Sequence, residues 1–215
     1  MPGILDFLSI MFERNNAVQI RISLDEITPE VWRRLVVPAS WDLQKLHLAI
    51  QAAFNWWDSH LHEFLIGGLR YGDAEFLMRD TFEDECRVFD YHEVRLSDFA
   101  RPGSSFTYVY DFGDNWQHTV VIEDFLTVDP PPKKATCISG ARARPPEDVG
   151  GFPGYENFLE IMADPDHDEH KQTKRWCGGH FDPEWFDLAM VDKDVQNATR
   201  SNVRRRLHQP KPKAK

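Results

Sequence analysis

Histidine and aspartate recur in two segments of the chain at spacings that could hold a divalent metal ion. His60 and His62 are two residues apart in a segment with strand character, so their side chains are expected on one face. Asp111, Asp114 and His118 follow in a turn between two alternating runs. Imidazole nitrogens and carboxylate oxygens together bind zinc, manganese or iron. The pattern therefore predicts a mixed metal site at these five residues, with a divalent cation as the implied cofactor.

The same residues also have structural interpretations. His60 could close the turn that begins at Asp58, and His62 could pack in an aromatic core. Asp111 and Asp114 could accept backbone N–H groups, because tight turns favour aspartate, asparagine and glycine. The metal site is one hypothesis among these alternatives.

Glu147 and Asp148 form a second candidate group on a Gly/Pro-rich loop at 137–154, which is too long for a simple connector. Neighbouring carboxylates could act as general acid and base. They could equally anchor the loop by binding Arg142, Arg144 or backbone N–H groups. No nucleophile is evident beside them, so the sequence leaves open whether the protein is an enzyme.

The elements that would position these residues follow from hydrophobic periodicity. Strict alternation predicts strands, and apolar residues at helical spacing predict one long helix. The strands are expected at 18–24, 31–37, 61–66, 106–111 and 116–128, and the helix at 43–55. The order of hairpin, helix, strand and Gly-rich turn predicts an α+β fold, with a β-grasp-like mixed sheet of about five strands and one packed helix.

A chain of 215 residues with 41% hydrophobic and 13% aromatic residues suits one globular domain. We expect an N-terminal extension at 1–15, a single domain at 16–195 and a basic tail at 196–215. The domain would comprise a sheet part at 16–129, then the Gly/Pro loop and a C-terminal helical segment at 130–195. Helices are expected there at 155–163, 169–176 and 183–191.

The charge is distributed unevenly. The net charge of −10 argues against non-specific nucleic-acid binding by the body of the protein. Residues 200–215, however, carry seven of the 25 basic residues and no acid, so this tail could contact nucleic acid, bind another acidic surface or fold back on the domain. The apolar run near the N-terminus is too short to span a bilayer and lacks the features of a signal peptide. We expect a cytoplasmic protein that does not bind membranes.

Six blocks of the chain, in unbroken order, carry a family resemblance; they lie at 27–34, 57–64, 110–118, 140–151, 154–155 and 164–167. Over about residues 16–195 the chain resembles the plasmid pRiA ORF-three-like family. The resemblance implies an α+β protein of bacteria or archaea without an established biochemical activity. Some members are labelled as mobile-element passengers or resolvases, but this chain has neither a serine nucleophile beside arginines in an N-terminal strand nor an evident helix-turn-helix.

One departure from the family pattern concerns the Gly/Pro loop. Many relatives have cysteines on either side of the block at 145–148, where this chain has Arg144 and Val149. A metal site or cross-link that used those thiols could not form here.

These observations favour an interaction or ligand-binding module for an unidentified protein or small molecule. Its polar surface would comprise His60, His62, the hairpin at 111–118 and the loop at 140–151. The alternatives are a metal-dependent hydrolase that uses the same histidines and aspartates, and a mobile-element accessory protein that contacts DNA through residues 200–215.

Overall fold

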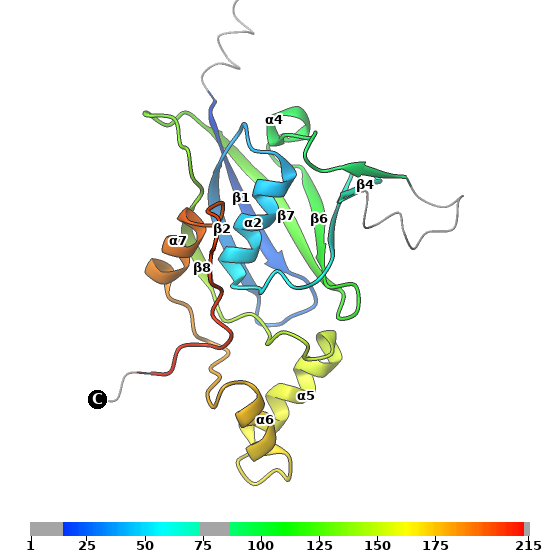
Figure 1. Ribbon diagram of the computed structural model, residues 1–215, viewed down its shortest axis with the longest axis vertical. Helices are drawn as coiled ribbons and strands as arrows, with labels where there is room; N and C mark the ends of the chain where they lie inside the picture. The colour runs from blue at the N-terminus through cyan, green and yellow to red at the C-terminus, as the bar shows by residue number, and fades with distance from the viewer. Residues whose placement is uncertain (1–14, 74–86, 213–215) are drawn as a thin grey trace, which may run out of the picture.

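One eight-stranded sheet organises the protein (Figure 1). The structure, a computed structural model, describes residues 15–73 and 87–212. The strand order is β5-β4-β3-β6-β7-β1-β2-β8. The strands are β1 (Ala17–Leu24), β2 (Val31–Pro38), β3 (His62–Ile66), β4 (Leu69–Gly72), β5 (Val88–Asp90), β6 (Ser105–Tyr110), β7 (Trp116–Leu126) and β8 (Thr136–Ala141). β4 and β5 pair in parallel, and the other neighbours pair antiparallel.

The expected β-grasp-like sheet of about five strands with one packed helix is wrong, and the α+β class holds only broadly. The described residues form eight strands and five short helices, which are α2 (Leu43–Phe54), α4 (Leu96–Phe99), α5 (Gly151–Ala163), α6 (His170–Trp176) and α7 (Leu188–Gln196). The strand that follows α2 does not join the first hairpin, because the β6–β7 hairpin lies between β3 and β1.

The strand β8 forms where the sequence predicted a loop. Its residues pair with β2 along one edge of the sheet. Gly140 weakened the strand pattern in the sequence, since glycine is rare in strand interiors. At this position a Cβ atom would lie 2.8 Å from both the Trp32 carbonyl oxygen and the Phe186 ring. Only a residue without a side chain therefore fits here.

Helix α2 covers one face of the sheet (Figure 1) and forms where the periodicity predicted it. Asp42 caps its N-terminus by accepting the Lys45 N–H at 2.8 Å, and Asn55 ends it in a left-handed conformation. Its apolar face joins the strand residues Ile20 and Ile22 in the core. The end of α2 therefore fixes where the chain enters the loop that carries His60.

The C-terminal part lies at one end and one side of the sheet. Figure 1 shows α5 and α6 at the end of the molecule, and α7 beside β8. The helix expected at 183–191 lies later, at Leu188–Gln196. The chain then turns back: Asn55 Nδ2 donates to the Arg206 carbonyl at 2.9 Å, and Gln209 Nε2 donates to the Asp182 carbonyl at 2.8 Å.

The expected N-terminal extension, apart from Asn15, lies outside the described residues. No helix within the described ranges is long and apolar enough to cross a membrane.

Candidate functional site

Four side chains from three segments converge near the end of β6, and we call them the acidic cluster: His60, Asp111, Glu147 and Asp148. The Nε2 atom of His60 lies 3.6 Å from Asp111 Oδ2, 3.9 Å from Glu147 Oε2 and 3.2 Å from Asp148 Oδ1. The ligand atoms of His60, Asp111 and Asp148 all lie within 4.8 Å of one another. Of the seven residues predicted for the site, the structure brings these four together.

Backbone geometry orients the Asp111 carboxylate. Asp111 directly follows β6 and has φ of 57°, a left-handed conformation that aspartate tolerates better than most residues. Its Oδ1 atom accepts the Gly113 N–H at 3.0 Å, as in many aspartate turns. Its other oxygen, Oδ2, faces His60. Asp111 thus stabilises the turn with one oxygen and leaves the other for a ligand.

The His60 ring approaches the cluster from the loop before β3. Its centroid lies 5.8 Å from that of Tyr110 in an edge-to-face arrangement. The Ser59 N–H in turn donates to the Tyr110 hydroxyl at 3.2 Å, which fixes the loop against β6. Because His60 precedes the strand, its side chain does not share a strand face with His62.

Glu147 is the buried member of the cluster. Its side chain is 0% exposed and accepts hydrogen bonds from the Trp57 N–H and, at 3.4 Å, from the Tyr110 hydroxyl. Burial raises the pKa of Glu147, although Arg144, the Trp57 N–H and His60 oppose the rise. Glu147 therefore takes up a proton more readily than an exposed glutamate.

Asp148 is the exposed member. Its side chain is 60% exposed, against 30% for His60. Like Asp111, Asp148 has a left-handed backbone, with φ of 55°. The cluster is thus open to solvent on the Asp148 side and closed on the Glu147 side. One imidazole and several carboxylates are suitable donors for zinc, manganese or iron.

The structure places His62 outside the cluster. Its ring stacks on that of His47, with centroids 3.5 Å apart and planes 5° from parallel. Tyr91 and Tyr108 lie edge-on or tilted against it. Burial lowers the pKa of His62 to about 2, with a further contribution from His47. The imidazole is therefore a neutral part of an aromatic core.

His118 and Asp114 also lie outside the four-residue set. His118 is fully buried and its Nε2 accepts the Trp56 indole N–H at 3.1 Å, so the ring proton sits on Nδ1, 3.1 Å from the Trp116 carbonyl. Burial lowers the pKa of His118 to about 4. Asp114 Oδ2 accepts the Gly150 N–H at 3.1 Å. Asp114 therefore ties the β6–β7 turn to the loop that carries Glu147 and Asp148.

The sequence analysis did not predict a chain of buried side-chain hydrogen bonds beside the cluster. His47 lies between Asp58 Oδ1 and the Tyr108 hydroxyl, at 2.8 Å from each. The Tyr108 hydroxyl also accepts the Gln51 side-chain amide at 2.9 Å. The signal in the sequence was a histidine and a glutamine four residues apart on the apolar face of the predicted helix.

Comparison with known proteins gives three concordant matches. A family model described as "Plasmid pRiA4b ORF-3-like protein" matches residues 16–190. An uncharacterized protein, y4hQ, of Sinorhizobium fredii is 36% identical over 185 residues, which cover 85% of this chain and 92% of that protein. The crystal structure of a protein of unknown function from Methanosarcina mazei Go1 superimposes with a TM-score of 0.70 at 37% identity, covering 83% of this chain and 97% of that one.

Proposed function

The chain belongs to the plasmid pRiA4b ORF-3-like family, and we propose that it is a ligand-binding module that holds a divalent cation in the acidic cluster. The observation that carries the proposal is the convergence of His60 Nε2 with three carboxylate oxygens at 3.2–3.9 Å. His60, Asp111 and Asp148 would be the ligands, since their donor atoms lie close enough to share one ion.

The backbone at the two aspartates supports this proposal. Left-handed conformations of residues other than glycine cost energy and gather at functional sites. Asp111 and Asp148 both adopt one, with φ of 57° and 55°. Two costly conformations within one cluster of side chains favour a role for that cluster beyond folding.

The exposure of the cluster favours a bound partner at the ion. Asp148 is 60% exposed and lies on the solvent side, so an ion held there would keep coordination positions open. A ligand with a carboxylate, phosphate or imidazole group could fill those positions. The module would then use the cation as the bridge between itself and that ligand.

The properties of Glu147 favour metal-dependent hydrolysis as a second candidate. Its carboxylate lies 3.9 Å from His60 Nε2, on the buried side of the cluster, and its pKa is raised by burial. A carboxylate placed there could accept a proton from a metal-bound water. Wild-type protein loaded with zinc or manganese should then cleave members of a panel of chromogenic esters and phosphate esters. Glu147→Gln should abolish turnover and retain the metal; activity that survives this substitution would exclude Glu147 as the base.

Metal analysis of protein purified without an affinity tag, followed by titration with zinc and manganese, tests the cation site. We expect saturable binding to the wild type, and an increase in Kd of at least about tenfold in Asp111→Asn. Asparagine can keep the turn, because its side-chain oxygen can still accept the Gly113 N–H. Asp166→Asn, an exposed carboxylate between α5 and α6, is the matched control. A wild type without affinity for either ion, or an equal loss in the control, would overturn the proposal.

A further inference from the structure

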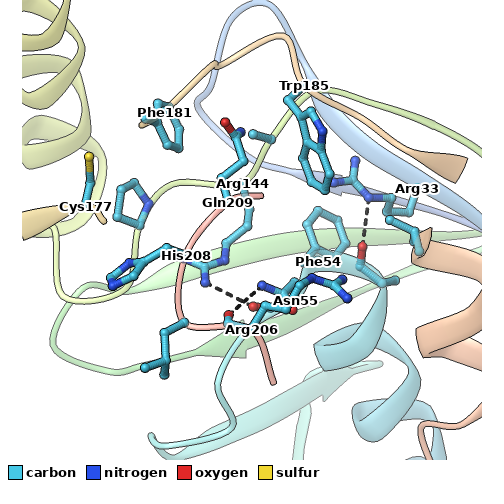
Figure 2. Close-up of a pocket in the computed structure, with 15 residues that line it drawn as sticks. Arg33, Phe54, Asn55, Arg144, Cys177, Phe181, Trp185, Arg206, His208 and Gln209 are labelled. Carbon is cyan, nitrogen blue, oxygen red and sulfur yellow. Dashed lines mark hydrogen bonds between the residues drawn. The ribbon is translucent and has the colours of Figure 1, made fainter. Parts of the chain in front are cut away.

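A cavity lined by basic side chains lies beside the C-terminal segment, residues 206–209, and we call it the arginine cavity (Figure 2). Its 15 lining residues include Arg33, Arg144, Arg206 and His208 but no aspartate or glutamate. This concentration of positive charge occurs in a chain with 35 acidic and 25 basic residues. Phe54, Phe181 and Trp185 supply apolar walls, and Asn55 and Gln209 supply amides.

Arg33 brings a buried charge to the cavity without a carboxylate partner. The residue is 2% exposed, and its guanidinium lies between the rings of Phe54 and Phe186, at 5.0 and 4.7 Å. Its N–H groups donate to the carbonyls of Ala53, Trp32, Ala141 and Arg142 at 2.7–2.9 Å. Within the described ranges no carboxylate forms a salt bridge with it. Burial lowers the pKa of Arg33 to about 10, and Cys137 opposes this fall.

Arg144 has donors to spare. Its guanidinium lies 4.7 Å from the Trp56 ring centroid and donates to the Asn55 carbonyl at 3.0 Å and to the Pro145 carbonyl. A guanidinium has five N–H groups in a planar fork, so these two bonds leave most of the fork free. Burial lowers the pKa of Arg144 to about 10 as well. Figure 2 shows the Arg144 side chain beside Asn55, with a dashed line for the hydrogen bond between them.

The C-terminal segment forms one wall through specific contacts. Arg206 forms an ion pair with Asp194, and its carbonyl accepts the Asn55 amide at 2.9 Å. Gln209 exchanges two hydrogen bonds of 2.8 Å with the backbone of Asp182. His208 packs on Gly178, where a Cβ atom would lie 2.4 Å from the imidazole ring. The segment is therefore seated on the domain by side chains as well as backbone.

The size of the cavity restricts its occupant. A water-sized sphere can occupy about 50 Å³ of it, whereas one water needs roughly 10–15 Å³ by that measure. A few water-sized groups fit, but a bulky molecule does not. The positive charge of the arginine side chains favours an anion as the occupant. The planar guanidinium group can donate two parallel hydrogen bonds to a pair of phosphate oxygens.

We propose that the arginine cavity binds a phosphate-type oxyanion, either free or as the terminal group of a larger molecule. Arg144 would be the main donor and Arg33 would add positive potential, while Arg206, which is paired with Asp194, and His208 line the same cavity. This site goes beyond the proposed cation-binding function and does not need a bound cation, because no lining residue belongs to the acidic cluster. The two sites do influence each other, since Arg144 interacts electrostatically with Glu147 and Asp148.

Titration of the full chain with inorganic phosphate and with phenyl phosphate, followed by phosphorus NMR and calorimetry, tests the proposal. A chelator in the buffer keeps the acidic cluster free of metal, so failure here is distinct from failure of the cation site. We expect saturable binding of inorganic phosphate to the wild type. Binding of phenyl phosphate as well would identify the terminal group of a larger molecule as the source, and binding of inorganic phosphate alone would identify the free ion.

Two variants and one matched control decide the location. Arg144→Lys keeps the charge but loses the fork, so the Kd for phosphate should rise at least about tenfold. Arg206→Gln should weaken binding severalfold, whereas Arg204→Gln, an exposed arginine just before this segment, should not change it. If Arg144→Lys does not fold, the comparison of Arg206 with Arg204 decides alone. The proposal is overturned if neither ligand binds saturably, or if Arg206→Gln and Arg204→Gln bind alike.

Discussion

The acidic cluster and the arginine cavity share one short segment of chain and differ in how their charges are held. Arg144 faces the cavity, while Glu147 and Asp148, a few residues later, face His60. In the cavity, Arg33 is fixed by backbone carbonyls and aromatic rings, and the C-terminal segment covers it. In the cluster, Asp148 is 60% exposed and, among the residues that the structure describes, forms a salt bridge only with the His60 imidazole.

This difference separates Arg33, a charge that supports the fold, from Asp148, a charge that is free for a ligand. Removing a buried guanidinium leaves several carbonyl groups without partners, and that costs stability. Neutralising an exposed carboxylate beside other carboxylates relieves repulsion and costs little. Substitutions at Arg33 and at Asp148 should therefore have opposite effects, with a loss of stability at Arg33 and a loss of metal binding at Asp148.

The largest expected effect is on Arg33. Arg33→Ala should lower the free energy of unfolding by roughly 3–5 kcal/mol, because four carbonyl groups, two of them in fully buried hydrogen bonds, lose this donor. Urea denaturation measures this. Arg34→Ala is the control, since its salt bridge to Glu123 at 2.7 Å is partly exposed and should contribute about 1 kcal/mol or less. Equal losses of unfolding free energy in the two variants would mean that Arg33 contributes no more to stability than a partly exposed salt bridge does.

The next effect separates His62 from His60. An unfolded imidazole has a pKa near 6.5, whereas burial holds that of folded His62 at about 2. Between those values the unfolded chain binds a proton that the folded protein does not, so stability falls as the pH falls through this window. His62→Phe should remove about one proton, or about 1.4 kcal/mol per pH unit, from the slope of unfolding free energy against pH.

Denaturant titrations between pH 6 and 4 measure that slope. The same variant should bind zinc and manganese as the wild type does, because His62 lies against His47 and not in the acidic cluster. An unchanged slope together with lost metal binding would place His62 functionally with His60.

The third prediction concerns Asp148. Asp148→Asn should weaken zinc and manganese binding at least about tenfold while it changes the free energy of unfolding by less than about 0.5 kcal/mol. Asparagine tolerates the left-handed backbone that Asp148 adopts, so the loop should persist. Calorimetry and denaturation of one protein preparation give both numbers. A large loss of stability would show that Asp148 is structural, as Arg33 is.

The smallest expected effect concerns the C-terminal segment, residues 206–209, which forms one wall of the arginine cavity. Gln209→Ala removes two hydrogen bonds to Asp182 and should cost about 1 kcal/mol of local stability. Exchange of the Asp182 amide hydrogen, which donates to Gln209 Oε1, should then accelerate, and Arg204→Ala should leave it unchanged. Equal exchange in the wild type and Gln209→Ala would mean that the segment is not held by this contact.

Local patterns predicted the elements better than their arrangement. Alternation identified β1 and β2, and helical spacing identified α2. Strand order depends on pairing between distant segments, so nothing local indicated that the β6–β7 hairpin lies between β3 and β1. The glycine that lets β8 pack under Phe186 removed its strand signal altogether.

For the candidate site, residue types were a better guide than strand periodicity. The pairing of His60 with Asp111 was expected from their chemistry, but His62 was included because both histidines were assigned to one strand. Tyr108 and Phe64, which surround His62, were visible in the sequence and favoured the aromatic core. The sequence predicted one polar surface that joins His60 to the loop at 140–151. The direct contact of Asp148 with His60 was not predicted, since the position of the loop involves the long-range contact between Asp114 and Gly150.

A crystal soaked in manganese or zinc, with anomalous diffraction data collected at the metal edge, tests whether His60, Asp111 and Asp148 hold a divalent cation. The account predicts one strong peak about 2.0–2.2 Å from His60 Nε2 and from carboxylate oxygens of Asp111 and Asp148, distances that are typical of these ligands. At a soaking concentration near the wild-type Kd, the same peak should be much lower in Asp148→Asn crystals. An empty acidic cluster in soaked wild-type crystals, or a peak of equal height in Asp148→Asn, would contradict the proposed cation site.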